Sequence, residues 1–370
     1  MKRTIRPVAA WLCLAANLTI GLPNIAAACT GITLVAKDGS AIQARTMEWG
    51  TFFLDSEIMV VPRQHVFKAA TPDGKAGLAW TGKYGIVGLN LVQTPVITDG
   101  MNEKGLTVSS LYLPGYEEGQ KYDPAKADQT LAMTDVPTWL LSNFATTEEV
   151  RKNMPDVIVT DVVLQAFHGI APPVHFMITD RSGKTIVLEY THGSLNIYDD
   201  PVGVLTNSPE FPWHLTNLRN YVGLHPQSNQ TIKVGDLELA PFGAGNGMVG
   251  LPGDYTPPSR FVRAAALRNT VRQPDTGYKA VNEAFRILDN FDIPLGATDA
   301  KANLPKDETI GSTQWSSAMD TASLRYYYHT MFNRSLRMID LKKTDFNKRE
   351  ISYFPLDARK EQSIETVMTR

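Results

Sequence analysis

The chain has 370 residues, enough for one large domain or two small ones with a substantial core. Its 36 Lys and Arg against 38 Asp and Glu give a formal net charge of −2, and its 43% hydrophobic and 20% charged residues are those of an ordinary globular protein. This mildly acidic balance gives no reason to expect nucleic acid or an anionic membrane surface as a partner.

The first 28 residues have the layout of a secretory signal peptide. Three basic residues at the start, an apolar run over residues 8–18 and an Ala-x-Ala pattern ending at Ala28 are typical of such a segment. The apolar run is too short for a membrane span. We therefore expect residues 1–28 to be removed on export, to the periplasm or as a secreted protein. The mature chain 29–370 would carry 33 basic and 38 acidic side chains, a net charge of −5, and no membrane attachment.

Cleavage after Ala28 would make Cys29 the first residue of the mature protein. The other cysteine, Cys13, lies in the signal, so the mature chain would keep one cysteine and no internal disulfide. A free α-amino group titrates near neutral pH, so it can take the proton of the thiol on its own residue. Cys29 would then supply both a nucleophile and its base.

A lipid-anchored binding protein is the alternative from a different class. Bacterial lipoproteins also carry a cysteine directly after the signal, where it is acylated. Ala26, however, stands three positions before the cysteine, where lipoprotein signals usually carry a larger aliphatic residue. A strand-like run over residues 31–36 also follows at once, in place of a flexible tether. The mass of the mature N-terminus separates the two hypotheses.

Strand and turn patterns dominate the part of the chain that follows Cys29. Residues 31–36, a turn at 37–40 and the return over 41–48 predict a hairpin, and residues 96–113 predict another around a turn at 102–105. Further strands are expected within 78–92 and at 175–179, 185–190, 194–198, 203–206, 312–319, 323–329 and 335–341, and helices at 138–144, 146–154, 213–221, 259–267 and 279–288. Because the strands follow one another through turns, we predict antiparallel sheets with helices outside them, in one domain over 29–370.

Patterns typical of other enzyme classes are weak. Residues 245–250 fit the glycine spacing of a dinucleotide site, but Pro252 follows closely and no helix begins there. None of the seven histidines has the spacing of a zinc site, so we expect no metal. A papain-like pair of Cys29 with His175 is conceivable, although the residues around Cys29 lack that family's signature.

Four other residues match what an amide hydrolase needs around its cysteine. The first hairpin returns Arg45 to the side of Cys29, where a guanidinium would promote the thiolate. Glu48 would hydrogen-bond the amine and orient it. Asn207 ends an apolar strand before a proline and is a candidate donor to the oxyanion, and Arg260 starts a helix after a Pro-rich loop. Taken singly, each also fits a turn or a surface position.

Taken together and in order, these motifs resemble the choloylglycine hydrolase family, which contains conjugated bile acid hydrolases and penicillin V acylases. The motifs span residues 29–32, 45–49, 99–105, 205–209 with 215–218, and 251–254 with 259–263. The resemblance runs from Cys29 to near the C-terminus. It implies an α+β fold, the four-layer αββα sandwich of the N-terminal-nucleophile hydrolases, and a homotetramer.

The resemblance also implies roles for individual residues. Cys29 matches the family's nucleophile and base, Arg45 the arginine beside the thiol, Asn207 the oxyanion donor, and Arg260 the later active-site arginine. Glu48 stands where many members have Asp.

Glu48 and Tyr112 depart from the pattern of the bile acid hydrolases, and Trp49 is similar to a residue of another branch of the family. Tyr112 stands where those enzymes carry Asn, so only its backbone N–H remains to serve the oxyanion hole while its side chain changes the pocket. Trp49 resembles the aromatic wall of the penicillin V acylase branch, to which the chain is therefore most similar.

We therefore predict an exported amidase of the penicillin V acylase type. It would cleave a linear amide of a small molecule through an acyl-enzyme on Cys29, without a cofactor. The expected acyl group is flat or apolar, such as phenoxyacetyl or fatty acyl. Conjugated bile acid hydrolysis and removal of the acyl chain from N-acyl homoserine lactones remain alternatives within the enzyme class.

Overall fold

Two large antiparallel sheets, stacked face to face, form the centre of the computed structural model, which describes residues 28–50, 52–167, 169–298 and 311–368. Positions 1–27 of the expected signal peptide lie outside these described residues. The first sheet has six strands in the order β14-β1-β2-β17-β18-β19. These strands are β1 (Cys29–Val35), β2 (Ala41–Trp49), β14 (Val204–Leu205), β17 (Ser312–Asp320), β18 (Arg325–Thr330) and β19 (Arg337–Asp340).

The second sheet has eight strands within the described residues, in the order β13-β12-β11-β8-β7-β6-β3-β20. These strands are β3 (Glu57–Val61), β6 (Ile86–Asn90), β7 (Ile97–Asn102), β8 (Thr107–Tyr112), β11 (Val174–Thr179), β12 (Thr185–Thr191), β13 (Ser194–Asp199) and β20 (Ser352–Pro355). Three small pairs lie outside the large sheets: β4 (Val66–Ala70) with β5 (Ala76–Thr81), β9 (Thr130–Ala132) with β10 (Ile158–Thr160), and β15 (Ile232–Val234) with β16 (Leu237–Leu239).

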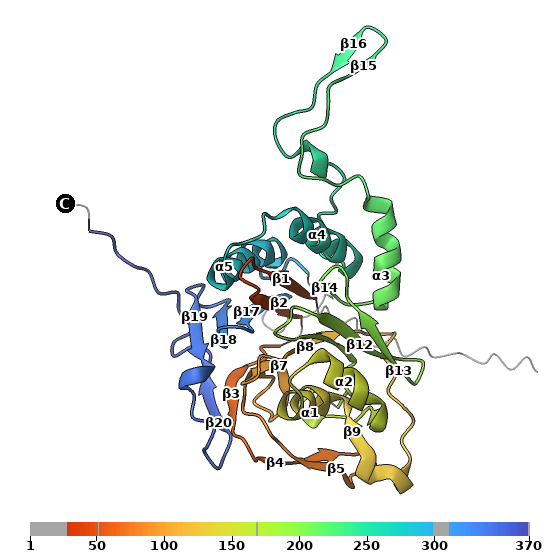
Figure 1. The fold of residues 1–370 in the computed structure, drawn as a ribbon, viewed down its shortest axis with the longest axis vertical. Helices are drawn as coiled ribbons and strands as arrows, with labels where there is room; N and C mark the ends of the chain where they lie inside the picture. The colour runs from red at the N-terminus through yellow and green to blue at the C-terminus, as the bar shows by residue number, and fades with distance from the viewer. Residues whose placement is uncertain (1–27, 51, 168, 299–310, 369–370) are drawn as a thin grey trace, which may run out of the picture.

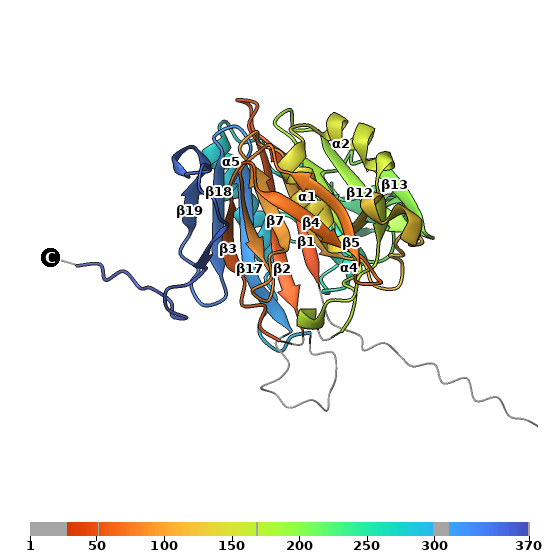
Figure 2. The same cartoon turned by 90° about the horizontal axis from the view of Figure 1, so that it is seen from below.

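Helices cover the two outer faces of the stacked sheets. They are α1 (Val136–Asn143), α2 (Thr147–Asn153), α3 (Phe211–Asn217), α4 (Pro257–Thr270) and α5 (Gly277–Leu288). In Figure 1, α4 and α5 lie over the six-stranded sheet, and α1 and α2 lie under the eight-stranded sheet. Figure 2 shows the same layers from below, with β18 and β19 on one side of the molecule and β12 and β13 on the other. This is the four-layer αββα sandwich, an α+β fold, that the resemblance implied.

Local sequence signals explain the helices that were expected. The capping box before α2 is confirmed: the Thr146 hydroxyl accepts from the Glu149 backbone N–H, and the Glu149 carboxylate accepts from the Thr146 N–H. In α5 the buried residues recur at helical spacing, from Ala280 to Leu288, and pack against β1, β2 and β17. The apolar face of α5 therefore covers the sheet that carries Cys29.

One small strand pair differs from the antiparallel pairing of the two large sheets. β9 pairs with β10 in parallel. Residues 133–157, which include α1 and α2, connect the two strands, and parallel strands require such a long connection. The glycine pattern at 245–250 contains only a short 3-10 turn, and the chain before it projects from the body of the molecule as the β15–β16 hairpin (Figure 1).

The register of β1 against β2 decides which side chains face the space between the sheets. Cys29 lies opposite Met47, and Gly31 lies opposite Arg45. A Cβ atom at Gly31 would come within 2.9 Å of the sulfur of Met177 on the other sheet, so glycine permits the close approach of the sheets there. Because side chains alternate along a strand, Cys29 and Arg45 share this inner face, while Glu48 faces the helices.

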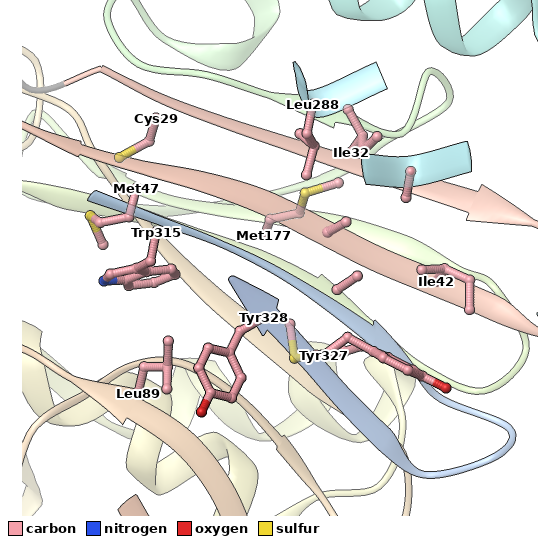
Figure 3. Packing of buried hydrophobic residues seen from close by; sticks show 14 of the residues in the cluster. Cys29, Ile32, Ile42, Met47, Leu89, Met177, Leu288, Trp315, Tyr327 and Tyr328 are labelled. Carbon is pink, nitrogen blue, oxygen red and sulfur yellow. The ribbon is translucent and has the colours of Figure 1, made fainter. Parts of the chain in front are cut away.

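The space between the sheets holds apolar side chains around Cys29 and its neighbour Arg45, and a network of polar side chains further along. Figure 3 shows Cys29, Met47 and Trp315 in succession across β1, β2 and β17. Further along, buried Asp99 accepts hydrogen bonds from hydroxyl groups of Ser317 at 2.7 Å and Tyr326 at 2.5 Å. The nucleophile candidate therefore lies at one end of a densely packed interface.

Candidate active site

The Cys29 thiol lies in contact with a buried arginine. Cys29 begins β1 and is 3% exposed, and its Sγ accepts a hydrogen bond from Arg45 Nη2 at 2.9 Å. The guanidinium is held on three further sides: Nη1 donates to Ser110 O at 2.5 Å, Nε donates to Thr46 O at 3.1 Å, and the group lies over the Trp315 ring. The structure therefore places Arg45 beside the Cys29 thiol, where the first hairpin was expected to bring it.

We expect Arg45→Ala to slow alkylation of Cys29 by iodoacetamide at neutral pH, as well as turnover. A hydrogen bond to a charged group is worth about 1.5–3 kcal/mol, which corresponds to a loss of roughly ten- to hundredfold in labelling rate. Arg63→Ala, which removes an ion pair with Glu103 on the other sheet, is the control and should leave labelling unchanged. Normal labelling with lost turnover in Arg45→Ala would instead assign Arg45 to the substrate.

Asn207 connects the start of β1 to the other sheet. Its Oδ1 accepts from the backbone N–H of Cys29 at 2.9 Å and from Arg260 Nη2 at 2.6 Å, and its Nδ2 donates to Tyr112 O at 2.7 Å. Because both groups that face Oδ1 are donors, the orientation of the amide follows from its partners. Nδ2 carries two hydrogens, and Tyr112 uses one of them, which leaves the second for an oxyanion.

The backbone N–H of Tyr112 is not used in the pairing of β8 with β11. Tyr112 pairs with Val174 of β11, and the N–H of the next residue, Leu113, donates to Pro173 O. Backbone groups alternate in direction along an antiparallel pair, so the N–H of Tyr112 faces away from β11, on the side where its carbonyl contacts Asn207.

Arg260 reaches the main chain of Cys29 from the helix layer. It lies in the first turn of α4 and is 1% exposed. Its Nη1 donates to Cys29 O at 2.5 Å and to Thr30 Oγ1 at 2.9 Å. Burial lowers the pKa of Arg260 to about 10, against the opposing effect of Glu48. Arg260 therefore fixes both the Cys29 backbone and the Asn207 amide.

Glu48 lies on β2, on the face of the six-stranded sheet that the helices cover. It is 2% exposed, its Oε1 accepts from Thr313 Oγ1 at 2.7 Å, and its Oε2 has no hydrogen-bond partner among the described residues. Burial raises the pKa of Glu48 to about 7, although Arg260 acts in the opposite direction. A buried oxygen without a donor is unfavourable, so a new donor, such as a free amine, would be stabilised there.

Four aromatic side chains pack against one another at the end of β2. We call Trp49, Phe52, Tyr112 and Phe167 the aromatic cluster. Trp49 meets the other three edge-on, with ring centroids 5.5 Å from Tyr112, 5.6 Å from Phe52 and 6.1 Å from Phe167. Trp49 shares the inner face of β2 with Met47, the partner of Cys29. The sequence did not predict Phe52 and Phe167 as members of the cluster. Phe52 could have been identified because it lies only three positions after Trp49, whereas no pattern in the sequence pointed to Phe167.

His175 does not contact the cysteine. Its Nδ1 lies 2.8 Å from Glu189 Oε1, and its Nε2 lies 3.1 Å from Thr206 O. With both ring nitrogens engaged in this way, His175 is not positioned as a base for Cys29, which removes the papain-like alternative. Among the described residues, no cluster of three or more His, Cys, Asp or Glu side chains could hold a metal ion, and no helix is long and apolar enough to cross a membrane.

Two antiparallel sheets stacked between two layers of helices are the fold of the N-terminal-nucleophile hydrolases. The family model described as linear amide C–N hydrolases, choloylglycine hydrolase family, matches residues 29–354. The chain belongs to the choloylglycine hydrolase family and is a linear amide C–N hydrolase.

Bile acid hydrolases and a penicillin V acylase are among the proteins that resemble this chain. A bile salt hydrolase/transferase of Clostridium perfringens is 36% identical over 328 residues, which cover 88% of this chain and 96% of the relative. The structure of a variant of the conjugated bile acid hydrolase of the same organism has a TM-score of 0.78 at 33% identity, covering 92% of this chain and all of that one. The penicillin V acylase of Agrobacterium tumefaciens has a TM-score of 0.69 at 25% identity, covering 88% of this chain and 90% of that one.

Proposed function

We propose that the protein is an exported amidase of the penicillin V acylase type, in which Cys29 becomes the N-terminal nucleophile once residues 1–28 are removed. The observation that carries the proposal is the 2.9 Å contact of Arg45 with Cys29 Sγ, on a residue whose own backbone nitrogen is held by Asn207. The contact stabilises a thiolate, and Asn207 keeps the nitrogen that becomes the amine at a fixed position.

In the acylation step, the free amine takes the thiol proton and the thiolate attacks the carbonyl carbon of the amide. The carbonyl oxygen becomes an oxyanion, which accepts from the second hydrogen of Asn207 Nδ2 and from the Tyr112 N–H. Glu48 Oε2 accepts a hydrogen bond from the resulting ammonium group. The ammonium then gives its proton to the leaving nitrogen, the C–N bond breaks, and an amine departs from a thioester on Cys29.

Deacylation repeats these roles with water. The neutral amine takes a proton from a water molecule, whose oxygen attacks the thioester carbonyl, and the oxyanion again accepts from Asn207. Collapse of the intermediate releases a carboxylic acid and returns the thiolate to its position beside Arg45. No cofactor enters either step.

The aromatic cluster supports a preference for flat or slim acyl groups. Its rings would contact an aryl or alkyl group through edge and face contacts, and the Tyr112 side chain beside Trp49 would leave less room for a bulkier steroid. We therefore expect a higher kcat/KM for penicillin V than for glycocholate, with long-chain N-acyl homoserine lactones also accepted. Discrimination between apolar groups amounts to only about 1–3 kcal/mol, so some glycocholate hydrolysis is expected.

Trp49→Ala is expected to raise KM for penicillin V more than it lowers kcat, because it removes contacts made equally in the ground and transition states. The measurement is steady-state hydrolysis of penicillin V, glycocholate and an acyl homoserine lactone by the purified protein and the variant. Trp80→Ala is the control, since Trp80 stacks on Phe67 in the small β4–β5 pair. A wild-type preference for glycocholate would refute the role given to Trp49 and Tyr112 while leaving the role of Cys29 intact.

Bile salt hydrolysis is the second candidate, and the 36% identity to the Clostridium perfringens bile salt hydrolase/transferase favours it. The same substrate comparison decides between the two. A lipid-anchored binding protein would instead show a lipid on Cys29 by mass spectrometry and no turnover of any of the three amides.

The periplasm is the proposed location, and a homotetramer the proposed assembly. The β15–β16 hairpin supports association between copies, because it projects from the body of the protein (Figure 1) with apolar side chains that are 43–61% exposed. These side chains are Ile232, Val234, Leu237 and Leu239. Exposed apolar groups at such a density favour a contact that covers them. Light scattering of the purified protein measures the assembly.

A further inference from the structure

Asn207 has little regular secondary structure to hold it in place. The strand before it, β14, has only two residues, Val204–Leu205, and α3 does not begin until Phe211. The side chain of Asn207 nevertheless makes hydrogen bonds to Cys29, Arg260 and Tyr112. Something other than a strand ladder must therefore fix the backbone of the segment 206–211.

Two buried imidazoles hold the backbone carbonyls at and before Asn207. His175 Nε2 lies 3.1 Å from Thr206 O, and His214 Nε2 lies 2.8 Å from Asn207 O. Both rings are fully buried. Because a carbonyl oxygen can only accept, each Nε2 carries the hydrogen and donates it. The pKa of His214 is lowered to about 4 by burial, so this ring is neutral with its single proton on Nε2.

Glu189 fixes the ring of His175 and reaches the far end of the same segment. Its Oε1 lies 2.8 Å from His175 Nδ1 and also accepts from the Phe211 backbone N–H at 3.0 Å. His175 belongs to β11 and Glu189 to the neighbouring strand β12, so the pair stands on the eight-stranded sheet. The pair thus ties both ends of the segment 206–211 to a rigid sheet.

We propose that His175 and Glu189 are positioning residues for the reaction, which set the distance between Asn207 Nδ2 and the Cys29 thiol through the backbone of residues 206–211. This inference rests on the proposed role of Asn207 as an oxyanion donor. Neither residue touches the reacting atoms. Their effect is on geometry, and a displacement of about 1 Å of a donor can cost about a hundredfold in rate.

The test is a double-mutant cycle between His175→Gln and Asn207→Ala in the purified mature protein, with a substrate that the wild type hydrolyses. His175→Gln should lower kcat by about ten- to hundredfold, with KM and the iodoacetamide labelling rate of Cys29 changed by less than about twofold. In the Asn207→Ala background, His175→Gln should lower kcat by less than about threefold, because the side chain that His175 positions is already absent.

Glu189→Gln is the second variant and serves if His175→Gln does not fold, since it keeps an acceptor for the Phe211 N–H. Its loss of kcat should likewise disappear in the Asn207→Ala background. His329→Gln is the control: His329 is a buried imidazole on β18 that packs against Phe285, and its loss should leave kcat unchanged.

The possible outcomes distinguish a failure of this inference from a failure of the proposed oxyanion role of Asn207. Equal fold losses of kcat in the wild-type and Asn207→Ala backgrounds would overturn the inference alone, and so would an unchanged kcat in His175→Gln. An Asn207→Ala variant with full kcat would refute the oxyanion role of Asn207, and the inference would fall with it.

Discussion

A chain that keeps one residue before Cys29, such as an unremoved methionine, is expected to have no measurable amidase activity. The proposed base is the α-amine, and an amide nitrogen in its place has no basic lone pair. Loss of a general base alone costs about 10²–10⁴ in rate, and here the same group also protonates the leaving nitrogen. The measurement pairs a turnover assay with intact mass spectrometry, in which the active protein should begin at Cys29 and carry no lipid.

The blocked chain provides its own control. In the structure Ala28 still precedes Cys29, and the contact between Arg45 and Sγ is already present. Iodoacetamide should therefore still label Cys29 in the blocked chain, although turnover is absent. Full turnover by a chain whose blocking residue is shown by mass to remain would rule out the N-terminal-nucleophile mechanism.

Asn207→Ala is expected to lower kcat by about 10²–10³, the usual cost of one lost oxyanion donor. Labelling of Cys29 should change little, because alkylation by iodoacetamide forms no oxyanion on a carbonyl oxygen. Asn207→Asp is the matched variant: it keeps an oxygen for Cys29 N–H and Arg260 but removes the Nδ2 donor. If Asn207→Asp retained the wild-type kcat, Asn207 would be a structural residue and not an oxyanion donor.

Local signals made much of the nucleophile's surroundings predictable. A turn at 37–40 fixes the register of β1 on β2, and this register alone brings Arg45 beside Cys29. The hairpin of β7 and β8 was predicted in the same way, because the turn at 102–105 between the two strands has a recognisable sequence pattern. These expectations succeeded because the contacts that they describe lie within about twenty residues in the chain.

Contacts between distant segments could not be predicted in the same way. Asn207 contacts Tyr112 across 95 positions, and Phe167 joins the aromatic cluster from a short 3-10 helix whose sequence carries no recognisable pattern. The strands β3 and β20 were missed for a related reason, since they pair with each other across almost the whole chain. The family resemblance implied the role of Asn207, but the residues that contact Asn207 could be identified only from the folded structure.

The position of β17 has a consequence for the order in which the molecule folds. β17 lies in the interior of the six-stranded sheet and pairs with β2, although it follows β2 by more than 250 residues, and its Trp315 supports the guanidinium of Arg45. Until Ser312–Asp320 arrives, one edge of β2 is open and Arg45 lacks that ring. Such long-range pairing slows folding. The six-stranded sheet of a nascent chain therefore stays incomplete until Ser312–Asp320 has been synthesised, a delay that would suit the export proposed for this protein.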